Sequence, residues 1–305
     1  PGYYEVMLDD YNVKAQLTAT QRVGVHKYTF PKNEQGRIIL DLNHGIYNYD
    51  GKVLWASIRV ESPTLITGYR ITNGWARTNY TYFAISFSQP VINYGYKDME
   101  QILYKGFWRK FPVNANFPEM AGRKVVSYFE FDTHANPELE VKVALSATST
   151  NGALLNLQAE AAEKSFAQIA AETSENWNSQ LASIEVEGTE DQKAMFYTSY
   201  YHTMINPSVY MDADGKYRGL DQNVHQAIGF KNYTVFSLWD TYRNVHQLLT
   251  LVYPEVQTDM VRSMVAMSQE WGWLPRWELY GRETFTMEGD PAIPVIVDSY
   301  LKGLR

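Results

Sequence analysis

The chain has 305 residues, of which 45% are hydrophobic and 20% are charged, and its formal net charge is -7. This acidic balance, with no block of Lys and Arg, excludes nucleic acid and anionic membrane surfaces as expected partners. The chain has no cysteine, which excludes disulfides, thiolate metal sites and a cysteine nucleophile. No apolar run approaches the ~20 residues that cross a bilayer, so we expect no membrane insertion.

The front of the chain, to about residue 150, alternates apolar and polar residues in short runs separated by turn residues. Alternation with a period of two indicates strands, and many short strands at close spacing are typical of a β-sandwich. We therefore predict a β-sandwich domain over residues 1–150. The clearest runs are 14–20, 37–42, 54–60, 80–87, 124–131 and 138–145.

The middle of the chain changes to a sequence rich in Ala, Glu and Gln, with apolar residues at steps of three and four. This spacing predicts a helix over 156–184, and we interpret residues 151–188 as a helical linker between two domains.

The back of the chain keeps the helical period, which predicts helices over 191–206, 238–252, 254–271 and 291–305. Thr189 is the expected N-cap of the first, with Gln192 at the capping-box position, and Pro254 suits the start of the third. The last helix carries an apolar face, and the chain begins with Pro1 and no initiator Met. We therefore expect 189–305 to be a truncated helical domain in a piece of a longer protein.

Most catalytic motifs are missing. There is no Gly-rich dinucleotide or P-loop fingerprint, no zincin helix and no nucleophile elbow. The six histidines include no pair at helical ligand spacing. We interpret Asp212 to Gly215 as a plain turn, because the twelfth position of a calcium loop would be Asn223 where a Glu is required.

Two segments near the end carry the residues that suit sugar chemistry. In the first, Trp239 and Asp240 lie next to each other, and Asp240 precedes Arg243 by three residues, a spacing that allows a polar pair at a helix start. The second, 272–291, combines Trp and acidic side chains in a stretch broken by Gly and Pro. Aromatic faces cover the C–H surface of a sugar ring while carboxylates accept its hydroxyl protons. A salt-bridged loop between helices, with Trp in the core, explains the same residues equally well.

At these residues the chain resembles the α-mannosidases of glycoside hydrolase family 92. The likeness runs over essentially the whole chain, and its motifs are specific only in combination. They are Pro1 to Tyr11, Arg22 to Phe30, Tyr201 to Pro207, Tyr217 to Asp221, Leu238 to Arg243 and Gly272 to Pro275.

The resemblance implies an N-terminal β-sandwich, or supersandwich, that is followed by a helical linker and part of an (α/α)6 barrel, residues 189–305. It further implies an exo-acting, inverting, calcium-dependent enzyme that removes terminal α-mannose from glycans and is exported to the periplasm or the extracellular space. Asp240 matches the family's sugar-binding aspartate and Glu283 its loop acid, so Trp239, Asp240, Arg243 and Glu283 are the expected substrate-binding residues.

The catalytic acid and base of the family are expected beyond Arg305, and no catalytic residue or calcium ligand is assigned to this chain. The 305-residue piece is therefore expected to be inactive alone. Two alternatives remain: a non-catalytic carbohydrate-binding or scaffolding fragment, and another α/α-toroid glycosidase or phosphorylase. The linkage preference, natural glycan and oligomeric state are not predicted.

Overall fold

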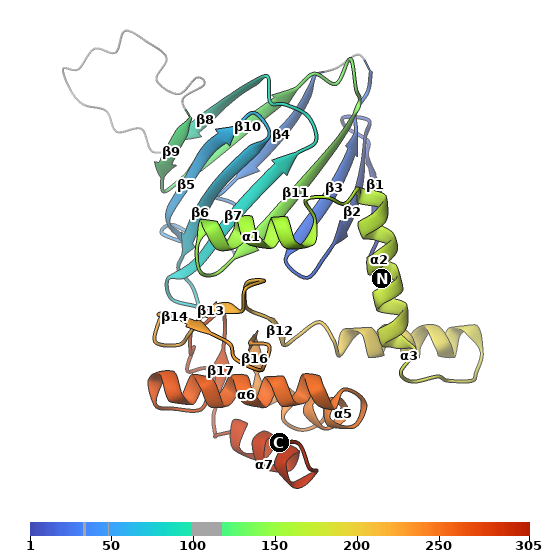
Figure 1. Ribbon diagram of the computed structural model, residues 1–305, viewed down its shortest axis with the longest axis vertical. Coiled ribbons are helices and arrows are strands. Elements are labelled where there is room, and N and C mark those ends of the chain that lie inside the picture. The colour runs from blue at the N-terminus through green and yellow to red at the C-terminus, as the bar shows by residue number, and fades with distance from the viewer. Residues whose placement is uncertain (33–34, 48, 99–117) are drawn as a thin grey trace, which may run out of the picture. The chain divides into compact units, whose positions relative to one another are not determined.

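The structure, a computed structural model, describes residues 1–32, 35–47, 49–98 and 118–305 (Figure 1). These residues form two compact units. The first comprises Pro1–Gly74 and Tyr80–Ser174, and the second comprises Trp75–Asn79 and Glu175–Arg305. The domain boundaries at residues 150 and 188 stay predictions.

The first unit is built from two sheets, as the alternating pattern predicted. The larger has eight strands in the order β1-β2-β3-β11-β7-β6-β5-β9, and the smaller has three in the order β4-β10-β8. All six of the predicted runs coincide with strands. The strands are β1 (Tyr4–Leu8), β2 (Val13–Ala19), β3 (Val23–Thr29), β4 (Gly36–Asp41), β5 (Val53–Ser62), β6 (Leu65–Thr72), β7 (Asn79–Phe87), β8 (Asn93–Asp98), β9 (Glu119–Gly122), β10 (Val125–Phe131) and β11 (Glu138–Ser146).

The core of the sandwich lies between the two sheets. Ile58 and Ile66 from the larger sheet and Phe129 and Phe131 from the smaller one are all buried in a single apolar cluster. Every second residue of β10 from Val125 is buried, which is the pattern that one inward-facing side of a strand produces.

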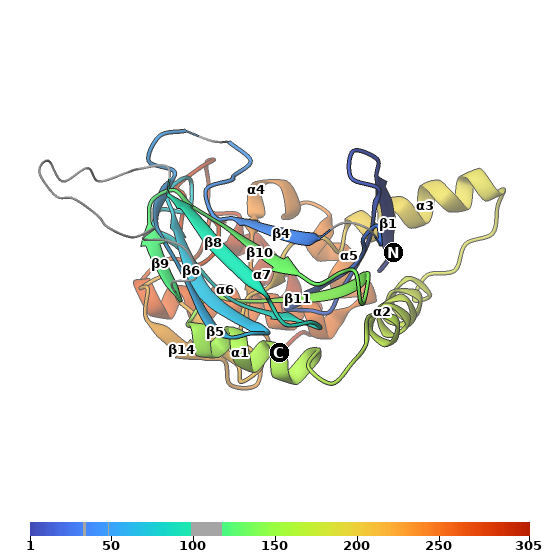
Figure 2. The same ribbon diagram turned by 90° about the horizontal axis from the view of Figure 1, so that it is seen from above.

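The other face of the larger sheet is covered by helix α1 (Thr150–Glu160), which lies across the strands in Figure 1. Seen from above, α1 and the strands of the smaller sheet lie on opposite sides of the larger sheet (Figure 2). Ala153 and Leu157 of α1 pack on Val25 and Ala144 of the sheet. The unit is therefore a sandwich whose larger sheet carries α1 on its outer face.

The second unit has a helical core. It contains α3 (Glu190–His202), α4 (Leu238–Thr241), α5 (Val245–Val252), α6 (Pro254–Trp271) and α7 (Ala292–Leu301), together with the short strands β12 (Ser208–Val209), β13 (Lys216–Arg218), β14 (Val224–Gln226), β15 (Tyr233–Thr234), β16 (Phe236–Ser237) and β17 (Trp277–Glu278). Helices α5, α6 and α7 pack on one another, and within the described ranges the helices do not close a barrel.

A buried polar chain ties the three packed helices together. His246 of α5 contacts Gln257 of α6 through Nδ1 and Oε1 at 3.0 Å, and the Gln257 amide donates to the Ser299 hydroxyl of α7 at 3.1 Å. Because the Gln257 oxygen can only accept, Nδ1 carries the proton, and Nε2 accepts from Thr241 at 3.0 Å. Burial lowers the pKa of His246, which keeps the ring neutral.

Two of the predicted helices are interrupted in the structure. The helix predicted over 156–184 is α1 followed by α2 (Phe166–Leu181), because Ser165 and Gln168 exchange capping hydrogen bonds that begin a new helix. The helix predicted over 238–252 is divided into α4 and α5 at Asn244, whose φ of -145 is not helical.

The predicted helix starts are confirmed. Thr189 and Gln192 form the capping box of α3, and Pro254 occupies the first turn of α6. The predicted turn after Asp212 is also present, closed by a 2.8 Å hydrogen bond from the Gly215 amide to the Asp212 carbonyl. No helix among the described residues is both long and apolar enough to span a bilayer.

Candidate active site

The first predicted site segment is held in place by two buried side chains. Phe236 of β16 and Leu238 of α4 are both fully buried, whereas Trp239 and Asp240, which follow directly, are exposed. The chain leaves a buried strand and turns into one turn of helix here, so the two residues that suit a sugar face outward.

Asp240 is oriented by a neighbour on its own segment. Its Oδ2 accepts a short hydrogen bond from the Ser237 hydroxyl, and its Oδ1 accepts none from any residue in the described ranges. A carboxylate with one oxygen fixed and one free is suited to accept a hydroxyl proton from a ligand.

Asp240 and Arg243, which both lie in the described part of the chain, do not form the expected polar pair. The Arg243 guanidinium lies 5.8 Å from the centre of the Tyr242 ring and donates weakly to its hydroxyl at 3.4 Å. The Trp239 ring lies on the same tyrosine, with centroids 6.2 Å apart. The reason is the early end of α4: Arg243 lies beyond it and outside the helical frame that the spacing assumed. Tyr242, which the sequence did not single out, is the common neighbour.

Glu283 is committed to its own loop. Its two carboxylate oxygens accept from the backbone amides of Arg276 at 2.8 Å, Trp277 at 3.1 Å and Phe285 at 2.9 Å. Three amide donors make this side chain a support for the loop 276–285. Trp277 is half-buried, and its ring meets the edge of Trp75 at 5.7 Å between centroids.

The two site segments are brought together by a short antiparallel pair. In it Phe236 lies opposite Glu278, and Ser237 lies opposite Trp277. The structure therefore joins the Trp239–Asp240 segment to the loop that contains Glu283.

Glu278 is the residue that fastens this pair, and sequence reasoning did not select it. It is fully buried and accepts from the Thr234 hydroxyl at 2.8 Å, the Val235 amide at 3.0 Å and the Gly281 amide at 2.6 Å. Burial raises the pKa of Glu278 to about 7, against the lowering effect of these donors. The contacts that identify Glu278 come from two backbone segments, one of them more than 40 residues away, so only the folded structure reveals them.

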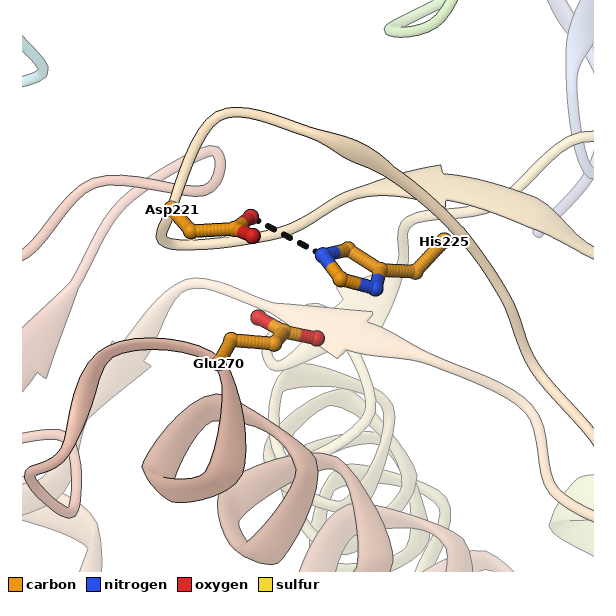
Figure 3. A group of neighbouring side chains, drawn as sticks. All are labelled: Asp221, His225 and Glu270. Atoms are coloured by element: carbon orange, nitrogen blue, oxygen red, sulfur yellow. Dashed lines mark hydrogen bonds and ion pairs between the residues drawn. The ribbon is translucent and has the colours of Figure 1, made fainter.

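A group of metal-ligating side chains lies elsewhere in the second unit. Asp221 and His225 come from the β13–β14 hairpin and Glu270 from the end of α6, and all three point toward one another (Figure 3). In the described part of the chain this is the single group of three or more such residues. Calcium prefers oxygen ligands throughout, so a set that includes an imidazole nitrogen does not fit the calcium site that the resemblance implies.

Comparison with known proteins gives the family. The family model described as glycosyl hydrolase family 92 catalytic domain matches residues 152–305, and that of the family 92 N-terminal domain matches residues 1–146. The chain belongs to glycoside hydrolase family 92. No curated protein matches it.

Solved structures of the same family agree over the whole chain. The α-mannosidase BT3965 from Bacteroides thetaiotaomicron, in complex with mannoimidazole, is 35% identical with a TM-score of 0.91, over 100% of this chain and 39% of that one. The inverting mannosidase BT2199 of the same organism is 30% identical, with a TM-score of 0.86, over 100% and 39% of the two chains. The chain thus spans about two-fifths of the length of these structures.

Proposed function

We propose that this chain is part of an exo-acting, inverting, calcium-dependent α-mannosidase that removes terminal α-mannose from glycans. The observation that carries the proposal is the 35% identity and TM-score of 0.91 to an α-mannosidase over 100% of this chain. The family is shown by two domain matches. The names of the similar structures, an α-mannosidase and an inverting mannosidase, support a mannose-containing glycan as the proposed substrate.

In this proposal the exposed pair Trp239 and Asp240 binds the terminal mannose. The indole face covers the C–H side of the ring, and the free Oδ1 of Asp240 accepts a hydroxyl proton. Arg243 extends the row formed by the Trp239 and Tyr242 rings and offers a cation to a further hydroxyl. Glu283 contributes to the proposed sugar site by holding the loop 276–285 in place through the Arg276 and Trp277 amides.

Inversion requires a general acid and a general base with carboxyl groups ~6.5 to 9.5 Å apart, which leaves room for the attacking water. Neither role falls to Asp240, which we propose as a binding group, or to Glu283, which holds its loop. We propose that the acid and base come from elsewhere in the whole protein, and that the 305-residue chain alone hydrolyses no mannoside.

Calcium dependence is also part of the proposal, supported by the family alone. When bound, calcium would polarise the ring hydroxyls of the sugar. The Asp221, His225 and Glu270 set does not suit calcium, because it includes an imidazole nitrogen. We also propose export to the periplasm or the extracellular space, and this proposal too is supported only by membership of the family.

The test is the substitution Asp240→Ala in the whole protein. Loss of the hydroxyl acceptor should lower kcat/KM on α-mannobiose by a factor on the order of a hundred or more, since the hydrogen bond is charge-assisted and buried by the sugar. The Tm should not change, because Asp240 is exposed and makes one local hydrogen bond.

The matched control is Glu288→Gln, which removes an exposed charge from the neighbouring loop and should keep normal turnover. Near-normal kcat/KM in Asp240→Ala, or an equal loss in both variants, would refute the role of Asp240.

A further inference from the structure

Asp221, His225 and Glu270 offer one ligand atom each, and these atoms all lie within 4.8 Å of one another. Asp221 Oδ1 and His225 Nε2 are 2.9 Å apart. Ligands about 2.0 to 2.2 Å from a zinc ion lie roughly 3.3 to 3.6 Å apart, so a shift of about 1 Å in the long Glu270 side chain closes the set. We propose that this trio binds a divalent transition ion, with zinc as the best fit.

The chemistry of the donor set selects the metal. One imidazole and two carboxylates suit zinc and its neighbours in the first transition row, whereas calcium and magnesium favour oxygen alone. Three protein ligands leave a fourth position of a tetrahedral ion to water. The site is reachable, because the exposed fractions of the His225 and Asp221 side chains are 33% and 22%.

Charge favours an ion at this place. Neither Asp221 nor Glu270 forms an ion pair with a Lys or Arg of the described residues, and the one partner of Asp221 that can carry a charge is His225 itself. Two half-buried carboxylates therefore face one imidazole ring, and a divalent cation would balance both carboxylates.

The carboxylates are already held by outer hydrogen bonds, as metal ligands commonly are. Glu270 accepts from the Tyr217 hydroxyl at 2.6 Å and from the Leu220 amide at 2.9 Å. Asp221 accepts from the Asn223 amide at 2.9 Å and its side chain at 2.7 Å. Asp221 Oδ2 and both oxygens of Glu270 keep a lone pair for a metal, and Asp221 Oδ1 gains one when the ion replaces its contact with His225 Nε2.

Gly219 makes the close approach possible. A Cβ at this position would lie 2.6 Å from Glu270 Oε2 and 2.7 Å from His225 Cδ2, so any larger residue would fill the space where the two ligands meet. Gly219→Ala therefore tests the geometry of the site without a change in its charge. The variant retains all three ligands, but its methyl group pushes the Glu270 carboxylate aside.

A bound ion would fasten the β13–β14 hairpin to α6. The hairpin also supports the loop 276–285, since the Gln222 side chain donates to the Gly281 carbonyl at 2.6 Å. The expected consequence is a more rigid support under that loop and a higher Tm, because an ion that binds only the folded state stabilises it.

The experiment is calorimetric titration of zinc chloride into the untagged whole protein with calcium saturating, together with its Tm. We expect one equivalent of zinc to bind at micromolar concentration and to raise the Tm. His225→Ala and Glu270→Gln should each weaken binding at least tenfold, and Gly219→Ala should weaken it as well. His202→Ala, which removes an exposed histidine of the same unit, should leave binding unchanged.

Absence of zinc binding, or equal binding in wild type, His225→Ala and Glu270→Gln, would overturn the proposal. So would a His202→Ala loss as large as that of His225→Ala. If His225→Ala fails to fold, Glu270→Gln decides, because glutamine has the same shape and its amide oxygen can still accept from either Tyr217 or Leu220. These readouts do not depend on mannoside hydrolysis, so their failure is separate from that of the proposed function.

Discussion

At the scale of single residues, Glu278 sets the most specific constraint. Its carboxyl has no contact with solvent and holds two backbone segments through Thr234, Val235 and Gly281. Because its pKa is raised from 4.5 to about 7 by burial, the folded protein keeps a proton between these values that the unfolded chain releases. The contribution of this proton to stability is full below pH 4.5 and is lost as the pH rises through about 7.

The prediction compares wild type with Glu278→Gln, a neutral side chain of the same shape. The stability of wild type relative to the variant should fall between pH 5 and pH 8, by an amount on the order of 3 kcal/mol at most. Denaturant unfolding of both proteins at the two pH values measures it. A relative stability that is constant or rises with pH would contradict the buried-carboxyl account.

The loss of stability should differ between Asp240→Ala and Glu283→Ala, because Asp240 is exposed whereas Glu283 accepts hydrogen bonds from three backbone amides. Glu283→Ala leaves the amides of Arg276, Trp277 and Phe285 without their acceptor, which should cost roughly 2 to 3 kcal/mol and lower the Tm by several degrees. Asp240→Ala should leave the Tm almost unchanged. Thermal unfolding of the two variants side by side decides, and the reverse order would show that the roles are exchanged.

At the scale of elements, the positions of the strands were predicted correctly, whereas the points at which two of the helices are interrupted were not. The runs 37–42 and 138–145 coincide with β4 and β11, because alternation is a property of the strand itself. The interruption at Ser165 was missed because helix-forming residues surround it, and the capping bonds with Gln168 outweigh their propensity. Arg243 was misplaced because its spacing from Asp240 assumed an unbroken helix, whereas α4 ends before Arg243.

Gly68 gives a prediction at this scale. It is buried in β6 opposite Ile58 of β5, and a Cβ here would lie 2.1 Å from the Ser57 carbonyl oxygen, which is backbone and cannot yield without moving the strand. Gly68→Ala should therefore destabilise the sheet by about 3 kcal/mol or more. Gly24→Ala, where the nearest atom is at 3.6 Å, is the matched control and should cost well under half as much. Chemical unfolding measures both, and equal costs would contradict the predicted clash.

At the scale of the whole molecule, the sequence was sufficient to predict the fold class and the family, but it did not identify the side chains that meet in the fold. The front sandwich, the helical back half and the family were all predicted, and all are confirmed. The trio of Asp221, His225 and Glu270 was not, because a hairpin and a helix end meet only in the fold. The role of Glu278 was hidden for the same reason. The substrate-binding roles of Trp239, Asp240, Arg243 and Glu283 stay predictions.

The most direct measurement of the central proposal is proton NMR of α-mannobiose during hydrolysis by the whole protein, with and without a calcium chelator. The account predicts free mannose whose β-anomer appears first, and loss of the signal with the chelator, because inversion at an α-linkage gives the β-sugar. Intact α-mannobiose after prolonged incubation with calcium, or an α-anomer that appears first, would contradict it.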